Sequence, residues 1–241
     1  MTVPAGTCCA ILGPNGSGKS ALVAVLSGYL WPSTGTVTVN GATFGRVDLA
    51  AVRRRIGLIE PSRAPKFDPQ MPVREVAATG LFGTIMLPLR EEVEPEQWRR
   101  VDEELAAVGL DAIADRAYGD LSSGEQMKTL LARALVSDAS VLLLDEPTVG
   151  LDMGSRAACI AVLDRLLERR DPPTLVIVSH HLDELPRAVD KVVLLKDGKV
   201  EDQGPPDKLL TSASLSRLFD CRVEVFKNDG RFVASVRSNP F

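Results

Sequence analysis

Residues 13–20, GPNGSGKS, decide the fold. They fit the pattern G-x-x-x-x-G-K-[ST], with the short apolar run TCCAIL (7–12) before them and a predicted helix from 18 to about 30 after them. In such a loop the glycines let backbone N–H groups face the α- and β-phosphates of a nucleotide, and the helix N-terminus adds partial positive charge. Lys19 would reach the β- and γ-phosphate oxygens, and Ser20 would ligate Mg²⁺.

The segments beyond this loop predict an α/β protein with a mostly parallel sheet. VLLLDEP (141–147) and TLVIVSHH (174–181) begin as continuous apolar runs, which are typical of parallel strands buried on both faces. Ile160, Leu163, Leu166 and Leu167 mark the inner face of a helix between them, so right-handed crossovers are expected. RRRIGLIEPS (53–62) predicts another strand. Hairpin turns are predicted at 40–41, 197–198 and 229–230.

Between these parts the periodicity becomes helical. Trp98, Val101, Leu105 and Val108 recur at steps of three and four, and Gly109 ends the pattern. We therefore expect a nucleotide-binding core with β hairpins at 1–64 and 136–241, interrupted by a helical subdomain at 65–135.

Two further stretches carry candidate chemistry. Asp145 and Glu146 end a core strand, where ligands of open α/β sheets bind, so Asp145 is a candidate Mg²⁺ ligand and Glu146 a candidate base for the attacking water. LSSGEQMKTLLARAL (121–135) places Ser122 and Gly124 before an amphipathic helix, whose N-terminus could hold a phosphate. The chain already has one phosphate-binding loop. A second phosphate-binding helix end makes best sense if it serves the nucleotide that another copy of the chain holds.

With these motifs in order, the chain resembles the ATP-binding subunits of ABC transporters. GPNGSGKS is similar to their Walker A, LSSGE to their signature loop (usually LSGGQ), VLLLDEP to their Walker B, TVGLD (148–152) to their D-loop, and the first histidine of VSHH (178–181) to their switch histidine. The resemblance covers about 3–236. Its ending, 218–236, is similar to iron-chelate uptake ATPases, and the nearest relatives are expected among iron-chelate and molybdate-type systems.

The resemblance implies a P-loop NTPase fold with a RecA-like core. It also implies an ATPase that binds ATP and Mg²⁺ between two subunits, either identical or paralogous, and drives separate membrane permease subunits from the cytoplasmic face. It implies catalytic roles for Glu146, His180 and Lys19, with His180 preferred to His181, and metal ligation by Ser20 and Asp145. The implied nucleotide-binding residues are Gly13, Pro14, Asn15, Gly16, Ser17, Gly18, Lys19, Ser20, Ala21, Ser122, Ser123, Gly124, Glu125 and Asp152.

Two departures from the family pattern raise further expectations. Family members usually carry one or two more strands and an adenine-stacking aromatic before the Walker loop, so a shortened antiparallel β region is expected, through a trimmed gene or, less simply, through adaptation. Base stacking would then come from elsewhere or be weak. A glutamine that contacts Mg²⁺ and couples to the membrane domain is usual where this chain has Pro61, flanked by Glu60 and Ser62; Gln70 lies too far along to replace it.

The composition and charge of the chain limit which functions and partners are plausible. A net charge of −4 and a pI near 5.4 argue against nucleic acid as a partner, and the basic run 53–55 is interpreted as a solvated element end. Four cysteines without a CxxC pair suggest buried small hydrophobes in a reducing compartment, and no apolar stretch is long enough to span a membrane. Three rival hypotheses are an ABC-type ATPase without a transporter, a DNA-maintenance ATPase and a nucleotide-binding module with impaired activity.

Overall fold

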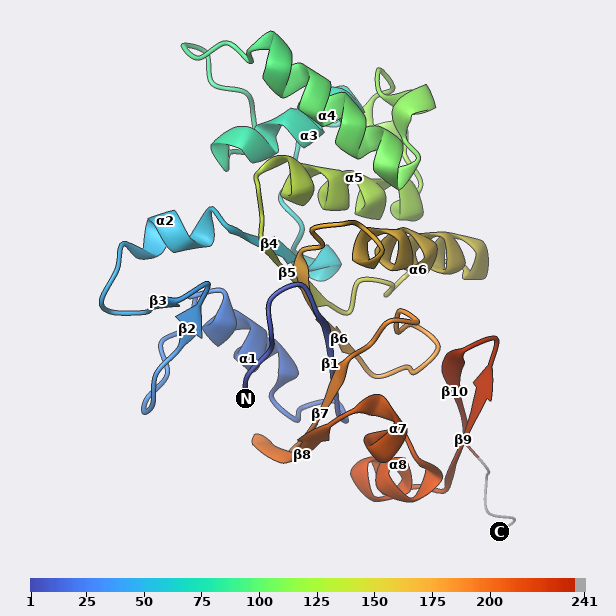
Figure 1. Cartoon of the computed structure of the whole chain (residues 1–241). Coiled ribbons are helices and arrows are strands. Elements are labelled where there is room, and N and C mark those ends of the chain that lie inside the picture. Colours follow the sequence, from blue (N-terminus) through green and yellow to red (C-terminus); the bar gives the residue numbers. More distant parts are fainter. Residues whose placement is uncertain (237–241) are drawn as a thin grey trace.

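A six-stranded sheet forms the centre of the protein (Figure 1). The computed structural model describes residues 1–236. The strand order is β4-β5-β6-β1-β7-β8, and every neighbouring pair is parallel except β7 and β8. This arrangement confirms the predicted α/β class with a mostly parallel sheet. The strands are β1 Cys8–Leu12, β4 Ile56–Ile59, β5 Val141–Asp145, β6 Thr174–Ser179, β7 Lys191–Lys196 and β8 Lys199–Gly204.

Strand β1 is buried on both faces, which explains its continuous apolar sequence. It lies between β6 and β7, and all five of its residues are fully buried. Cys8, Ala10 and Leu12 belong to one hydrophobic cluster, whereas Cys9 and Ile11 belong to a second cluster on the other face. The loop that follows β1 therefore leaves from the centre of a rigid sheet.

Helices cover both faces of this sheet. α1 (Lys19–Leu26) and α2 (Leu49–Arg53) contribute Val23 and Val52 to the cluster on one face. On the other face lie α5 (Ser123–Val136) and α6 (Met153–Leu167), and α3 (Val73–Phe82) and α4 (Pro95–Val108) pack beyond α5 (Figure 1). One continuous cluster joins these helices to the sheet. The division into a core and a subdomain at 65–135 stays a prediction.

The first helix is shorter than its sequence suggests. α1 ends at Leu26, and Gly28 takes a left-handed conformation with φ of 74°, which favours glycine. The backbone N–H groups of Tyr29 and Leu30 both donate to the carbonyl of Ala24, which closes the helix. The predicted end of this helix at about residue 30 is therefore wrong by several residues. By contrast, α4 ends at Gly109, as predicted.

The predicted hairpin turns are confirmed. β2 (Thr38–Val39) pairs with β3 (Ala42–Thr43), β7 pairs with β8, and β9 (Val223–Asn228) pairs with β10 (Arg231–Val236). Both turn residues have positive φ at each of the three sites, 40–41, 197–198 and 229–230. This is the backbone of the two-residue turns that Asn-Gly and Asp-Gly favour. α7 (Pro206–Leu209) and α8 (Ser212–Phe219) were not predicted.

Two expectations about single residues need correction. Cys8, Cys9 and Cys159 are buried as expected, but Cys221 is exposed because it lies in the turn between α8 and β9. Arg53 is half-buried, with its guanidinium 4.6 Å from the centre of the Tyr29 ring, so only the rest of the basic run is solvated. Among the described residues, no helix is long and apolar enough to cross a membrane.

Candidate nucleotide-binding and hydrolysis site

The phosphate-binding loop lies between β1 and α1, where the sequence predicts it. An added Cβ on Gly13 would lie 2.1 Å from the carbonyl oxygen of Leu195 in β7, so no larger residue fits at the start of the loop. Gly18 is the N-cap of α1 and has φ of 98°, a left-handed conformation that other residues rarely adopt. The loop is thus held tightly against the sheet and presents the N-terminus of α1.

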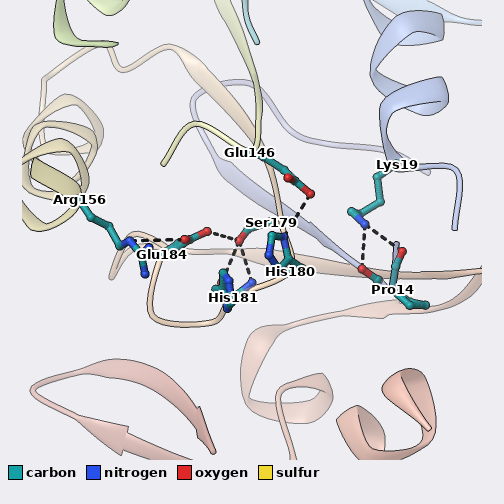
Figure 2. Close-up of polar contacts among 9 residues, drawn as sticks. Pro14, Lys19, Glu146, Arg156, Ser179, His180, His181 and Glu184 are labelled. Carbon is teal, nitrogen blue, oxygen red and sulfur yellow. Dashed lines mark hydrogen bonds and ion pairs between the residues drawn. The ribbon is translucent and has the colours of Figure 1, made fainter. Parts of the chain in front are cut away.

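Lys19, the first residue of α1, is 5% exposed. Its Nζ donates to the carbonyl oxygens of Gly13 at 2.8 Å and Pro14 at 3.0 Å (Figure 2). Burial lowers the pKa of this amine, while Glu146 and Asp145 act in the opposite direction. The ammonium group is therefore curled over its own loop, where a phosphate would give it a stronger partner.

Asp145, at the end of β5, suits a hard cation. The residue is 6% exposed and its Oδ1 has no hydrogen-bond partner, which leaves one carboxylate oxygen without a donor. Burial raises the pKa of this carboxyl, and a hydrogen bond from Ser20 partly opposes the rise. A carboxylate and a hydroxyl side by side are the oxygen ligands that Mg²⁺ takes in nucleotide sites. These two residues therefore fit the predicted metal pair.

Glu146 and His180 face each other across the ends of β5 and β6 (Figure 2). The Nδ1 of His180 lies 3.2 Å from Oε1 of Glu146, and about a third of each side chain is exposed. Glu146 has φ of 49°, the left-handed region that non-glycine residues seldom occupy. This conformation turns the chain sharply after Asp145, so the side chains of Asp145 and Glu146 point in different directions.

His180 is the histidine that contacts Glu146. His181 lies beside it, with ring centroids 4.0 Å apart and the rings tilted by 45°. His181 is exposed, and its backbone N–H donates to the Ser179 hydroxyl. The geometry thus separates the two histidines in the way that the motif register predicts. Which one serves hydrolysis remains a prediction.

The signature loop begins α5 with a reciprocal cap. The backbone N–H and the hydroxyl of Ser122 both donate to Oε2 of Glu125 at 2.7 Å, and the Glu125 N–H donates back to the Ser122 hydroxyl at 3.3 Å. The Ser122 hydrogen bonds lower the pKa of Glu125. A carboxylate therefore already occupies the helix end where the sequence predicts a phosphate, because this chain has glutamate where the family pattern has glutamine.

Asp152 caps the next helix, α6. Its carboxylate accepts from the backbone N–H of Ser155 at 2.8 Å and from the Ser155 hydroxyl at 3.0 Å, and these bonds lower its pKa. Within residues 1–236, no hydrogen bond or ion pair joins Asp152 or the loop 122–125 to the phosphate-binding loop 13–21. The predicted site residues therefore form two groups in one chain, one around Lys19, Asp145, Glu146 and His180, the other at the starts of α5 and α6.

A third group was not predicted from the sequence. Glu184 is buried beside Ser179, and Arg156 of α6 approaches it from the other side (Figure 2). In the sequence Glu184 stands between Leu182 and Leu185 but directly after Asp183, so nothing distinguishes it from a surface carboxylate.

The position of the missing glutamine borders a large groove. Pro61 begins a short 3-10 helix, and Glu60 forms an ion pair of 3.3 Å with Arg63. Glu60 and Arg63 line a cavity of about 800 Å³ between the sheet, α1 and the helices α3 and α5. Arg53, Arg54 and Arg133 also line this cavity, so cations outnumber the single carboxylate there. Gln70 does not line the cavity.

Comparison with known protein families gives the same assignment as the motifs. A family model described as ABC transporter matches residues 1–149. The uncharacterized ABC transporter ATP-binding protein YlmA of Bacillus subtilis is 35% identical over 222 residues, which are 92% of this chain and 83% of YlmA. The chain belongs to the ABC transporter ATP-binding proteins. It is thus an ATP-binding subunit and an ATPase, and the ABC-type ATPase without a transporter is not favoured.

Two other comparisons agree with this ABC ATPase assignment. The ferric enterobactin transport ATP-binding protein FepC of Escherichia coli is 32% identical over 227 residues, which are 92% of this chain and 80% of FepC. The cassette MJ0796, solved as a dimer with ADP and Pi after hydrolysis, has a TM-score of 0.69 at 27% identity and covers 85% of this chain and 88% of its own. The predicted P-loop NTPase fold is thereby confirmed.

Proposed function

We propose that this ABC ATPase hydrolyses ATP with Glu146 as the base and His180 as its partner. The observation that carries the proposal is the 3.2 Å contact between the two side chains at the end of the sheet that also holds Lys19. The reaction is phosphoryl transfer to water, in which positioning and charge neutralisation supply most of the catalysis. Glu146 accepts a proton from the water as it attacks, and His180 holds the carboxylate in place.

The phosphates bind to the loop residues from Gly13 to Ala21, with Lys19 on the β- and γ-phosphates. Its amine leaves the Gly13 and Pro14 carbonyls for these oxygens, which carry full negative charge. Ser20 and Asp145 would hold Mg²⁺, which neutralises charge on the phosphates when bound. The unpartnered Oδ1 of Asp145 supports this assignment.

Two copies of the chain, or this chain and a paralogue, then sandwich the nucleotide head to tail. The second copy contributes Ser122, Ser123, Gly124, Glu125 and Asp152. Support comes from the separation of these residues from the phosphate loop within one chain, and from the dimeric cassette MJ0796. Closure of such a dimer on ATP and its reopening after hydrolysis would supply the mechanical step.

Membrane permease subunits receive this motion at the cytoplasmic face, and we propose that they dock in the groove beside Glu60. The groove joins the helices of the proposed subdomain at 65–135 to the core, so a segment seated there would move with both. Its arginines favour a permease segment with an acidic residue and an apolar side. The relative FepC and the C-terminal residues 218–236 favour a metal chelate as the transported class.

The deciding experiment replaces Glu146. In Glu146→Gln the side chain keeps its size but no longer accepts the proton, so ATP hydrolysis should slow by at least about a hundredfold while ATP binding remains. ATP should then hold the variant as a dimer in size-exclusion chromatography. Glu168→Gln, at an exposed carboxylate after α6, is the control and should behave as the parent chain. Unchanged hydrolysis in Glu146→Gln, or a monomer under saturating ATP, would contradict the proposal.

A further inference from the structure

Glu184 is a buried charge that the proposed chemistry leaves without a role. It is 2% exposed and lies between the buried side chains of Leu182 and Leu185. Burying a carboxylate costs stability unless it is paired and hydrogen-bonded, and an uncharged residue of similar size would satisfy packing alone. The partners of this carboxylate therefore indicate what it does.

The first partner is Ser179, the last residue of β6, which precedes His180 directly. The Ser179 hydroxyl donates to Oε2 of Glu184 at 2.6 Å and accepts from the backbone N–H of His181 at 2.9 Å (Figure 2). A donor–acceptor chain thus runs from the carboxylate through the hydroxyl to the peptide just beyond His180. With its proton committed to Glu184, the hydroxyl keeps a lone pair for His181, so both sides of His180 are held.

The second partner is Arg156, in the first turn of α6. Its Nε lies 3.7 Å from Oε1 of Glu184, is buried, and has no hydrogen-bond partner. The backbone N–H of Arg156 donates to the carbonyl of Asp152 at 2.9 Å, so this arginine is tied to the residue that caps α6. A small approach of Arg156 towards Glu184 would satisfy the orphaned donor.

We propose that Glu184 is a positioning residue for ATP hydrolysis, which links Asp152 at the start of α6 to His180 through Arg156 and Ser179. The inference rests on the proposed function of His180. Movement of α6 when a second copy engages Asp152 draws Arg156 onto Glu184, and Ser179 transmits the change to the turn that carries His180. Closure of the dimer thereby holds His180 in the position against Glu146 that it already takes in the single chain.

The test compares Glu184→Gln, Ser179→Ala, His180→Ala and the double variant Glu184→Gln/His180→Ala. Glu184→Gln should lower kcat of the purified chain by about tenfold or more, because small misplacements of a catalytic group are costly. The KM for ATP and the affinity for a non-hydrolysable ATP analogue should not change, since Lys19 is untouched. Glu168→Gln, the same substitution at an exposed carboxylate at the C-terminal end of α6, is the matched control.

The double variant separates positioning from simple loss of structure. If Glu184 acts through His180, the double variant should be no slower than His180→Ala alone, a non-additivity that a general destabilisation would not produce. Losses of kcat that multiply in the double variant, or a Glu184→Gln variant as active as Glu168→Gln, would overturn the inference while leaving the role of His180 intact. Full activity in His180→Ala would instead overturn the proposed function. If Glu184→Gln does not fold, Ser179→Ala decides the question by the same comparison.

Discussion

Gly124 of the signature loop lies directly against Ser155 of α6. A Cβ added to Gly124 would lie 2.7 Å from the Cβ of Ser155 and 2.8 Å from its hydroxyl oxygen. Ser155 in turn donates twice to Asp152. The starts of α5 and α6, which the proposed dimer uses together, therefore form one rigid unit within the chain.

Gly124→Ala should break this unit. The added methyl group forces α5 and α6 apart, and such overpacking lowers the free energy of unfolding by about 1–3 kcal/mol. ATP-driven dimerisation of Glu146→Gln should weaken in the same background. Thermal unfolding and size-exclusion chromatography measure the two effects. Gly154→Ala is the control, since its added Cβ would meet nothing nearer than 3.4 Å. Wild-type behaviour of Gly124→Ala would show that the contact relaxes freely.

Glu125→Gln should strengthen ATP-driven dimerisation. The Glu125 carboxylate occupies the N-terminal end of α5, where it would repel the phosphate of the opposing nucleotide, while a glutamine keeps the cap without the charge. The ATP concentration that dimerises Glu146→Gln should fall several-fold when Glu125→Gln is added. Glu103→Gln, an exposed carboxylate on α4, should leave it unchanged. An increase in that concentration would mean that Glu125 assists the contact.

Lys19→Ala should abolish measurable ATP binding. The lysine supplies the buried cation of the phosphate loop, and its removal leaves the phosphates with uncharged donors only. Isothermal titration calorimetry with ATP in the presence of Mg²⁺ measures the affinity of the variant for the nucleotide. Lys199→Ala, on the exposed strand β8, removes the same charge at the surface and should bind ATP normally. An unchanged affinity in Lys19→Ala would place the nucleotide elsewhere.

The phosphate loop and the hairpins were predictable from the sequence because their chemistry is local. Gly18 and the Asn40-Gly41 turn require left-handed backbone, which few residues tolerate, so the residue type alone reports the conformation. The end of α1 was misjudged for a related reason. Gly28 already ends the helix in a left-handed conformation, whereas the prediction extended the helix to about residue 30.

The link through Glu184 was not predictable because its contacts are not local. Glu184 lies in the loop after β6 and Arg156 lies in α6, so only the tertiary fold brings them together. Cys221 shows the reverse case, in which a residue type that is usually buried is exposed by the turn after α8. The hydrophobic pattern of the sequence predicts which faces of helices and strands are buried. Which side chains meet across those faces depends on the tertiary fold.

Asp145→Asn should stabilise the metal-free protein at neutral pH. Burial raises the pKa of this carboxyl in the folded state above its value in the unfolded chain. As the pH rises, the unfolded chain therefore ionises first, and folding loses stability until the folded pKa is passed. Above that pH the penalty is constant, and below the unfolded pKa it is absent. Asparagine removes the penalty, so the Tm of the variant should exceed that of the parent near pH 7.

The comparison is made in EDTA over a series of pH values. The difference in Tm should shrink as the pH falls towards the ordinary range of an aspartate, about 4, where both states carry a proton. Asp115→Asn, at an exposed carboxylate, should show no such pattern. With Mg²⁺ and ATP the order should reverse, because a ligand that binds only the folded parent raises its Tm and the variant lacks a metal ligand. A Tm for Asp145→Asn that stays below the parent in EDTA would mean that the ionised carboxylate stabilises the fold, and that its unpartnered oxygen does not mark a site kept for a cation.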